Sequence, residues 1–336
     1  NKKSIHRPCS RSGRCERLES DATFADCESK NTYFNSINVV DDAACPAFQL
    51  RTDGRLDDVS FDANAVRKHC NKMRPKFSSG PDGYPPFLLK QIGPSIAGII
   101  AQLFQSFMSI GRVPSDWKQA IIKPLFKKGA SSDPASYRPI SLTSIFSKLM
   151  EKIIVEQMLK YLLTDNLISK QQHGFLSRRS TATNLIESLN DWTVKMENRQ
   201  GQSVAYIDFA KAFDSVSHPK LLTKLGAYGI GGVLLNWISD FLTGRSHVTR
   251  VGHCLSPIAF ITSGVIQGSC LGPLLFLLYI NDLAEAISAV ATMKLYADDV
   301  KLYSNMSAVP TNANVLQDQL NRLLEWSVVS PLRLSF

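Results

Sequence analysis

The stretch MKLYADDVKLY, residues 293–303, predicts how the second half of this chain folds. Apolar residues stand on either side of an acidic pair, which predicts two short strands that face one core. These apolar residues are Leu295, Ala297, Val300 and Leu302. Turn chemistry would explain the pair, Asp298 and Asp299, because Asp tolerates the left-handed conformation of a tight hairpin. A metal site would explain it too, because hard divalent cations bind several carboxylate oxygens.

Length and composition describe an ordinary globular chain. Its 336 residues can bury a sizeable core and hold two or three subdomains. The chain begins with Asn1 rather than Met, so we expect a fragment or a processed chain. Its longest apolar run, residues 271–280, is about half of what a bilayer span requires. No signal-peptide pattern opens the chain, so we expect no membrane association and no secretion.

Net charge and cysteine usage indicate the kind of partner and the redox compartment of the protein. The net charge of +9 favours a polyanionic partner, either nucleic acid or an anionic membrane surface. The alternative is mild basicity without a specific partner. The seven cysteines are irregularly spaced and form no zinc-ligand pattern, which indicates reduced thiols in an intracellular protein.

The order of the expected elements predicts an α+β layer, an antiparallel sheet with helices on one face. Residues 1–60 are polar and are expected to form a linker with short helical pieces, one of them at 31–40. The expected helices lie at 95–111, 140–163, 181–197, 234–242, from Pro273 onward, and at 315–326. The expected strands lie at 118–128, 203–213 and within 246–264, where Pro257 separates two of them. In the helix at 181–197, Leu185, Leu189, Trp192 and Met196 form one apolar stripe.

Asp208 is an acid near the end of the apolar strand VAYIDF, residues 204–209. It lies 298 − 208 = 90 residues before the hairpin, so only folding can bring the two together. Three carboxylates at one sheet edge would cost several kcal/mol of repulsion and desolvation. Two Mg²⁺ ions roughly 3.5–4 Å apart would remove that cost and serve an in-line displacement. The alternative is that all three acids only form turns.

Seven ordered motifs carry a resemblance to a known family. They are SSGPDG (78–83), IIKPLFKKG (121–129), YRPISLTSIFSKLMEKII (137–154), QHGFLSRRST (172–181), AYIDFAKAFDSV (205–216), SGVIQGSCLGPLLFLLYINDL (263–283) and LYADDVKLY (295–303). Together they resemble the reverse transcriptases of non-LTR retrotransposons, especially elements of the jockey/CR1 type. The resemblance covers roughly residues 61–336.

The resemblance implies a fold and a domain plan. The fold would be a right-hand polymerase of α+β class, with helical fingers, a ferredoxin-like antiparallel palm and a thumb that is largely absent. Residues 1–60 would be an N-terminal extension, and residues 61–336 would be the reverse transcriptase domain. The fingers would comprise mainly residues 61–200 and 215–255, and the palm mainly residues 201–214 and 256–336.

The same resemblance implies catalytic residues. Asp208 and Asp298 would be the main metal ligands, and Asp299 would face partly away and give weaker support. The backbone carbonyl of Phe209 would complete an octahedral Mg²⁺ shell. Phe213 matches the bulky position that excludes a 2′-hydroxyl and so selects dNTP over NTP. The alternative for Phe213 is a plain core aromatic.

Substrate-binding residues are implied in the same way. Arg138, with Lys127 or Lys128, matches the positions that clamp the incoming triphosphate; the alternative for one lysine is a solvated basic loop. Gln267 and Gly268 would approach the new base pair, or would only form a turn before a helix. The template- and primer-binding residues would be Gly80, Asp82, Gly83, Arg178 and Arg179.

Two departures from the family pattern accompany the resemblance. Ile266 stands where Pro is usual and Cys270 where Val is usual, so the loop around Gln267 is expected to be less pre-organised. The chain ends at SPLRLSF, where the family continues with an Asn, a Lys and a helical thumb. We expect the thumb and the endonuclease domain to belong to a parent polyprotein.

The implied function is that of an RNA-directed DNA polymerase. Its cofactor would be two Mg²⁺ ions, with Mn²⁺ as the substitute, and its partners an RNA template, a DNA primer and dNTPs. Family membership implies the nucleus, and otherwise the cytoplasm. The alternative is a catalytically dead remnant that acts at most as a basic nucleic-acid-binding domain. A palm-type nucleotidyl cyclase would also bind metal ions through carboxylates, but the motifs before Asp208 do not favour it.

Overall fold

The computed structural model describes residues 24–39, 41, 45–305 and 315–335, and it shows a mixed α/β chain with two sheets. The helices are α2 (Phe24–Ser36), α3 (Ala63–Asn71), α4 (Pro86–Ile92), α5 (Ala97–Ser109), α6 (Ile145–Thr164), α7 (Thr181–Glu197), α8 (His218–Ala227), α9 (Gly232–Leu242), α10 (Gly272–Ile280), α11 (Leu283–Ala286) and α12 (Val315–Val329). The strands are β1 (Gln119–Phe126), β2 (Tyr137–Leu142), β3 (Gln202–Phe209), β4 (Arg245–Val251), β5 (Cys254–Leu255), β6 (Ala259–Ile261), β7 (Thr292–Tyr296), β8 (Asp299–Asn305) and β9 (Leu334–Ser335). Two short 3₁₀ helices are η1 (Ser115–Lys118) and η2 (Pro134–Ser136).

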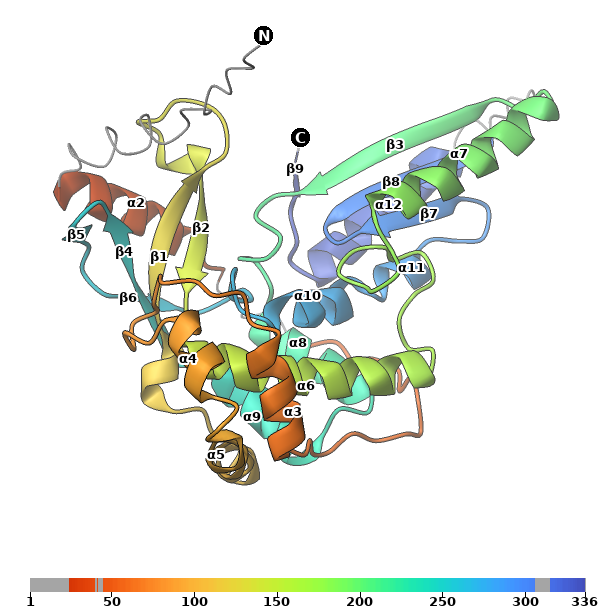
Figure 1. Cartoon of the computed structure of the whole chain (residues 1–336). Helices are drawn as coiled ribbons and strands as arrows, with labels where there is room; N and C mark the ends of the chain where they lie inside the picture. Colours follow the sequence, from red (N-terminus) through yellow and green to blue (C-terminus); the bar gives the residue numbers. More distant parts are fainter. Residues whose placement is uncertain (1–23, 40, 42–44, 306–314, 336) are drawn as a thin grey trace, which may run out of the picture.

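The first sheet has the strand order β2-β1-β4-β5, and β6 also pairs with β4 (Figure 1). β1 pairs with β2 antiparallel and with β4 parallel. The strands expected at 118–128 and within 246–264 are confirmed. The helix expected at 140–163 is wrong at its start, because residues 137–142 pair with β1 and form β2. α6 begins only at Ile145, where the Ser144 hydroxyl accepts hydrogen bonds from the amides of Phe146 and Ser147.

The second sheet has the order β7-β8-β3-β9 and is antiparallel throughout (Figure 1). The expected hairpin of β7 and β8 is confirmed, with Tyr296 opposite Asp299 as its last pair. The expectation of helices on one face is wrong. Trp192 of α7 packs on Tyr303, whereas Trp326 of α12 packs near Phe209, and these two strand residues point to opposite faces of the sheet.

The helix α7 has the predicted bounds but not the predicted buried face. Leu185 and Leu189 of its apolar stripe are 53% and 56% exposed. The helix instead turns Asn184 and Ser188 inward, and both bond the ammonium of Lys301, which is buried on β8. A buried lysine needs such partners, because its unpaired charge would be costly in the interior. The need of Lys301 for hydrogen-bond partners therefore decides which face of α7 packs against the sheet.

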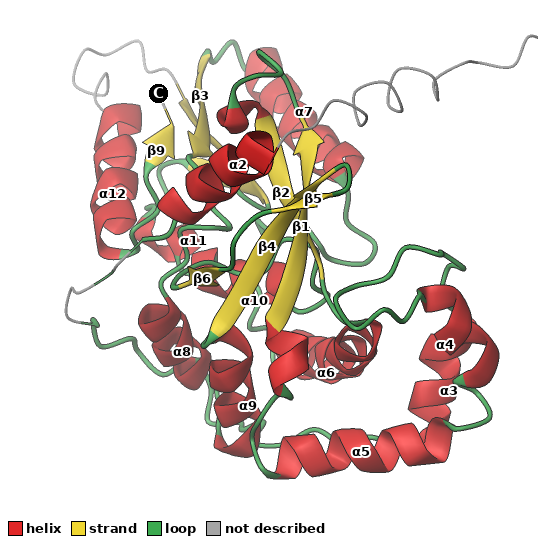
Figure 2. Ribbon diagram, turned by 90° about the vertical axis from the view of Figure 1, so that its left-hand side faces the viewer, coloured by secondary structure: helices red, strands yellow, loops and turns green. Residues whose placement is uncertain are grey.

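The core includes buried residues of α6, α8, α9 and α10, and these helices lie below the two sheets, with α10 nearest to the space between them (Figure 1; Figure 2 gives the second view). α10 is buried along its whole length, as its uninterrupted apolar sequence predicts. In α9, Trp237 stacks on Phe241 with ring centroids 5.4 Å apart. α3, α4 and α5 lie at one end of the molecule (Figure 2), and their buried residues join the same core, with α3 against α6 and α5 against α9. This arrangement leaves the facing edges of the two sheets to shape the site described below.

The expected linker contains a packed helix. α2 spans Phe24–Ser36 rather than 31–40, with Cys27 and Phe34 buried. The Asn31 carboxamide accepts a hydrogen bond from the Thr249 hydroxyl of β4. Residues 24–36 thus belong to the first sheet's packing, and residues 1–23 of the expected linker lie outside the described residues. The cysteines described as free are Cys27, Cys45, Cys70, Cys254 and Cys270.

A search of the described residues for membrane spans finds no single helix that is long and apolar enough. Only the pair of α4 and α5 passes by length and composition, and it bends by 117°.

Glu151 of α6 anchors the start of α10 and provides a stability test. Its carboxylate is fully buried and accepts hydrogen bonds from the amides of Cys270 (2.6 Å) and Leu271 (3.1 Å) and from the Ser147 hydroxyl (2.8 Å). Glu151→Ala leaves these donors without a partner, so the free energy of unfolding should fall by about 3 kcal/mol. Urea unfolding at neutral pH measures the change.

Glu156, on the same helix, is the matched control. It is half exposed and pairs with Lys68 and His69 at the surface. Glu156→Ala should cost less than about 1 kcal/mol, because exposed ion pairs contribute little. Equal losses in the two variants would contradict the anchoring role of Glu151.

Candidate active site

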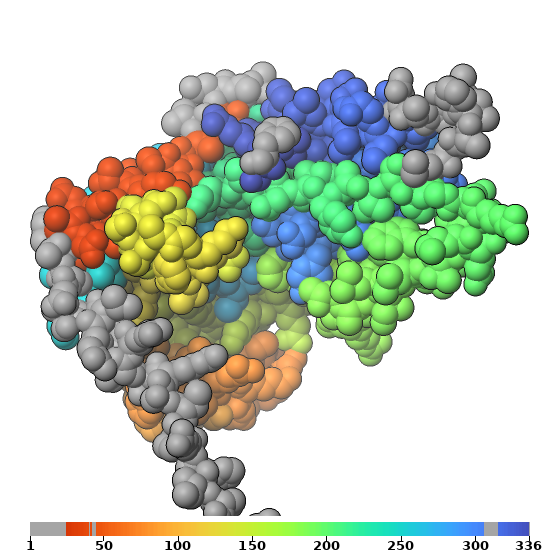
Figure 3. All heavy atoms as spheres, turned by 90° about the horizontal axis from the view of Figure 1, so that it is seen from above, coloured from red at the N-terminus to blue at the C-terminus, as the bar shows by residue number. Residues whose placement is uncertain are grey.

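An open pocket of about 850 Å³ lies where the two sheets face each other. Figure 3 shows a hollow there, between the yellow β1–β2 hairpin and the green and blue segments of the second sheet. The lining includes nine of the residues singled out in the sequence, drawn from segments up to 171 residues apart. They are Lys127, Lys128, Arg138, Asp208, Phe209, Phe213, Gln267, Gly268 and Asp298. The fold therefore brings most of the expected site residues together.

Two aspartates stand at the edge of the second sheet. Asp208 lies near the end of β3, and Asp298 lies in the turn between β7 and β8. Burial raises the pKa of Asp298, and the nearby charges of Asp299 and Asp208 raise it further, whereas Arg138 lowers it. Asp299 is exposed at the start of β8 and lines a second pocket, together with Asp208, on the α7 side of the sheet.

The turn itself corrects one interpretation of the acidic pair. Its left-handed residue is Ala297, with φ of +55°, and neither aspartate has a positive φ. Neither aspartate therefore supplies the left-handed residue of the turn, and turn chemistry alone does not explain the pair. The left-handed alanine is a rare and strained conformation.

The β1–β2 hairpin carries the basic residues. Arg138 lies in β2, while Lys127 and Lys128 follow β1. All three side chains are exposed and line the pocket from the side opposite the aspartates. The cations on this wall are suited to bind an anionic group such as a phosphate chain, whereas the carboxylates opposite are suited to bind a metal cation.

Phe213 and Gln267 form the floor of the pocket. The Phe213 ring is half-buried and stacks on Phe276 with centroids 4.4 Å apart. The Gln267 amide nitrogen donates to both carboxylate oxygens of Asp214, at 2.7 and 2.8 Å. A Cβ on Gly268 would lie 2.5 Å from the Ser141 carbonyl oxygen, so only glycine permits this close approach. Burial raises the pKa of Asp214 to about 6.

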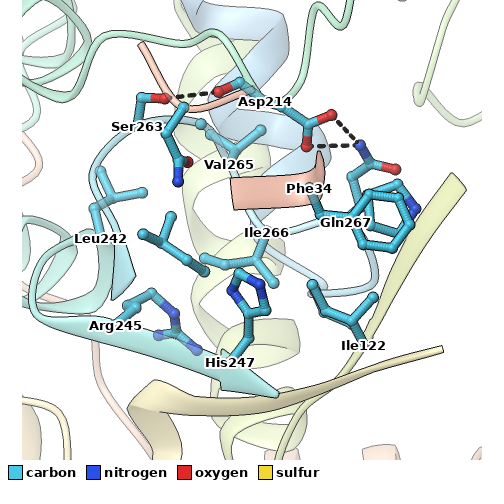
Figure 4. A pocket seen from close by; sticks show the side chains of 15 residues that line it. Phe34, Ile122, Asp214, Leu242, Arg245, His247, Ser263, Val265, Ile266 and Gln267 are labelled. Carbon is cyan, nitrogen blue, oxygen red and sulfur yellow. Dashed lines mark hydrogen bonds between the residues drawn. The ribbon is translucent and has the colours of Figure 1, made fainter. Parts of the chain in front are cut away.

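Asp214 is a site residue that the sequence interpretation missed. Its only signal was an acid directly after Phe213, within the motif AYIDFAKAFDSV. A smaller cavity of about 50 Å³ lies behind it, lined also by Arg245, His247 and Ser263 (Figure 4). Burial lowers the pKa of His247 to about 4, and neither of its ring nitrogens has a hydrogen-bond partner among the described residues. His247 is therefore neutral at physiological pH.

The five expected template- and primer-binding residues lie outside the large pocket. Gly80 packs so closely on the residue after β2 that a Cβ would lie 2.5 Å from the Thr143 carbonyl oxygen. Asp82 accepts a hydrogen bond from the Tyr84 amide, and Gly83 has φ of +73°, as a turn requires. The Arg179 guanidinium bonds the carbonyl oxygens of Lys170 and Gln172, so it is engaged within the protein. Arg178 is exposed.

The donor set of the pocket fits Mg²⁺. It contains the carboxylates of Asp208 and Asp298 beside the backbone of Phe209, and Mg²⁺ typically binds one or two carboxylates with substrate phosphates and water. Among the residues that the structure describes, no three His, Cys, Asp or Glu side chains are arranged to hold a metal ion by themselves.

Comparison with known proteins gives the family. Residues 125–335 match the family described as reverse transcriptase (RNA-dependent DNA polymerase). The chain is 31% identical over 235 residues to the RNA-directed DNA polymerase from mobile element jockey of Drosophila melanogaster, which covers 68% of this chain and 26% of that protein. It is 29% identical over 273 residues to the jockey protein of Drosophila funebris, covering 78% of this chain and 29% of that protein.

A third relative is the probable RNA-directed DNA polymerase from transposon BS of Drosophila melanogaster, 29% identical over 261 residues, with 75% of this chain and 28% of that protein covered. The family match extends over more than half of the chain. The chain belongs to the reverse transcriptase family, and the resemblance to enzymes of non-LTR retrotransposons is confirmed. It spans only between a quarter and three tenths of the length of these relatives.

The pKa of Asp214 yields a test of the pocket floor. An acid whose pKa is raised from 3.8 to about 6 on folding binds its proton more tightly in the folded state. Its contribution to stability is therefore present at low pH and is lost as the pH rises through about 6. The free energy of unfolding of the wild type minus that of Asp214→Asn should fall between about pH 4 and pH 7.

Urea unfolding at several pH values measures this difference. Asn keeps an oxygen that accepts from Gln267, so the variant changes mainly the charge. His247 and other buried groups titrate in both proteins, and their effects cancel in the difference. Curves that run parallel from low to neutral pH would show that Asp214 titrates as an exposed acid.

Proposed function

We propose that this chain carries the polymerase site of an RNA-directed DNA polymerase, which adds dNTPs to a primer 3′-hydroxyl under the direction of an RNA template. The observation that supports it most strongly is the single pocket with Asp208 and Asp298 on one wall and Arg138 with two lysines on the other. A nucleoside triphosphate would place its phosphate oxygens against the three cations, and Mg²⁺ would lie between these oxygens and the carboxylates. The names of the relatives describe the same activity for those proteins.

The structure also supports a division into fingers and palm, with revised limits. The palm would be the β7-β8-β3-β9 sheet with α8, α10 and α12, and the fingers would contain the first sheet. β6 pairs with β4, so residues 259–261 belong with the fingers rather than with the palm. Residues 181–197 would be grouped with the palm, because α7 contacts β7 of its sheet. α2 joins the fingers through β4.

Each group in the pocket has a task in nucleotide addition. Arg138 and one or both of Lys127 and Lys128 bind the triphosphate oxygens and hold the leaving pyrophosphate. Phe213 lies under the sugar, and its fixed ring leaves no room for a 2′-hydroxyl. The carboxylates of Asp208 and Asp298 orient the reacting oxygens.

Mg²⁺, or Mn²⁺ in its place, would be held by Asp208, Asp298 and the carbonyl of Phe209, where it would supply charge stabilisation at the attacking and leaving oxygens.

Another pocket, lined by basic residues, supports the proposal that the template is a nucleic acid. It has a volume of about 380 Å³ and lies at the far end of β2, beside Gly80. Five of its lining side chains are cations, and none has an ion-pair partner among the described residues. They are Lys72, Arg74, Lys76, Lys148 and Lys152. Such a cluster would bind the phosphates of a nucleic-acid strand that continues past the polymerase pocket.

Primer extension on a poly(rA)/oligo(dT) hybrid with Mg²⁺ tests the proposed activity. The wild type should incorporate dTTP, and Asp298→Ala should be slower by at least about a thousandfold, because a lost carboxylate removes several kcal/mol of charge stabilisation. Asp116→Ala, an exposed aspartate on η1, is the matched control and should behave as the wild type. Retention of RNA without incorporation by any of the proteins would favour the dead binding remnant.

Phe213→Ala tests sugar selection. Removal of the ring should raise the ratio of kcat/KM for rNTP to that for dNTP by about tenfold or more, since a steric penalty of at least about 1.4 kcal/mol disappears. Single-nucleotide incorporation measures both constants on one preparation. Loss of folded enzyme cancels in the ratio, so an unchanged ratio would assign Phe213 to the core alone.

A further inference from the structure

The turn that carries Asp298 is strained and needs a support. Tyr296 and Asp299 form the last pair of the hairpin, so Ala297 and Asp298 alone make the turn. Ala297 has φ of +55°, and at this first turn position a left-handed residue is usually glycine. The charges of Asp208 and Asp299 add repulsion at Asp298. Something beyond strand pairing must hold this geometry.

The support comes from the segment before α7. The Leu295 amide donates to the Gln171 carbonyl (2.9 Å), and the His173 amide donates to the Leu295 carbonyl (2.8 Å). These bonds lay the segment along the outer edge of β7. At the turn, backbone pairing ends and a side chain forms the next contact. The Gln172 carboxamide oxygen accepts hydrogen bonds from the backbone amides of Ala297 (2.9 Å) and Gly174 (2.7 Å).

The geometry admits this contact only with particular residues. The Gln172 side chain is 2% exposed, so water does not compete for its oxygen. A Cβ on Gly174 would lie 2.3 Å from the Ala297 nitrogen, and only glycine allows the approach. Arg179 bonds the Gln172 carbonyl and His173 bonds Thr183 of α7, so the segment is itself fixed.

We propose that Gln172 is a positioning residue: by accepting the Ala297 amide, it holds the turn in the left-handed conformation that keeps Asp298 facing the pocket beside Asp208. The consequence for catalysis rests on the proposed function, whereas the consequence for the turn does not. Gln172 does not line the pocket. It acts through the backbone of its neighbour.

Four variants test the proposal. Gln172→Met keeps the length of the side chain but removes the acceptor. Gln171→Met is the matched control, because the Gln171 side chain contacts Ser169 rather than the hairpin. Ala297→Gly relieves the strain of the turn, since glycine adopts positive φ freely. The double variant Gln172→Met/Ala297→Gly asks whether an unstrained turn still needs Gln172.

Two measurements are made on the whole chain. Hydrogen exchange of the residue 297 amide, read by NMR without metal, should be about tenfold faster in Gln172→Met than in the wild type or Gln171→Met. The Mg²⁺ concentration for half-maximal primer extension should rise about tenfold in Gln172→Met. The double variant should recover most of the Mg²⁺ dependence while its amide still exchanges fast.

The outcomes separate the possibilities. Equal exchange in the Gln172 and Gln171 variants overturns the proposal. So does a defect that glycine at position 297 fails to rescue, because Gln172 would then act through general stability. If the wild type shows no primer extension, the proposed function fails, and the exchange measurement alone decides whether Gln172 holds the turn.

Discussion

The site depends on the register between β3 and β8. Six residue pairs, from Gln202 opposite Asn305 to Ile207 opposite Val300, align the two strands. This pairing brings Asp208 beside the turn that holds Asp298. Because side chains alternate between the faces of a sheet, a slip of one residue would turn Asp208 into the core and break the pocket. Apolar residues of both strands oppose the slip, since Phe209 of β3 shares one buried face of the sheet with Val300 and Leu302 of β8.

Strain and like charge gather around the same pocket. Left-handed backbone is uncommon in residues other than glycine, yet Phe175 and Lys211 adopt it in the pocket wall and Ala297 adopts it beside Asp298. Burial raises the pKa of Asp298, and the charges of Asp299 and Asp208 raise it further. The fold tolerates these costs because the surrounding elements are rigidly anchored. Glu151 at the start of α10 and Gln172 beside the hairpin each satisfy two backbone amides from buried positions.

Much of the secondary structure was predictable, because its signals are local. The hairpin of β7 and β8, the helix α5 closed by Gly111 and the buried helix α10 follow from apolar spacing and turn residues. β2 was missed because its six residues run directly into α6, and only pairing with β1 makes them a strand. The exposed stripe of α7 was unpredictable from periodicity. Its rotation follows from the buried Lys301 on a strand more than a hundred residues later.

By itself, the sequence determined the chemistry: which residues are acidic, basic or aromatic, and the motif order that identified the family. It also placed nine site residues that one pocket unites. Only the tertiary structure decided which of them face one another, that Arg179 is engaged within the protein, and that Asp214 holds Gln267. The physical reason is the distance along the chain over which each effect acts. Propensity and periodicity act over a few residues, whereas burial, register and charge pairing depend on neighbours that folding brings from far along the chain.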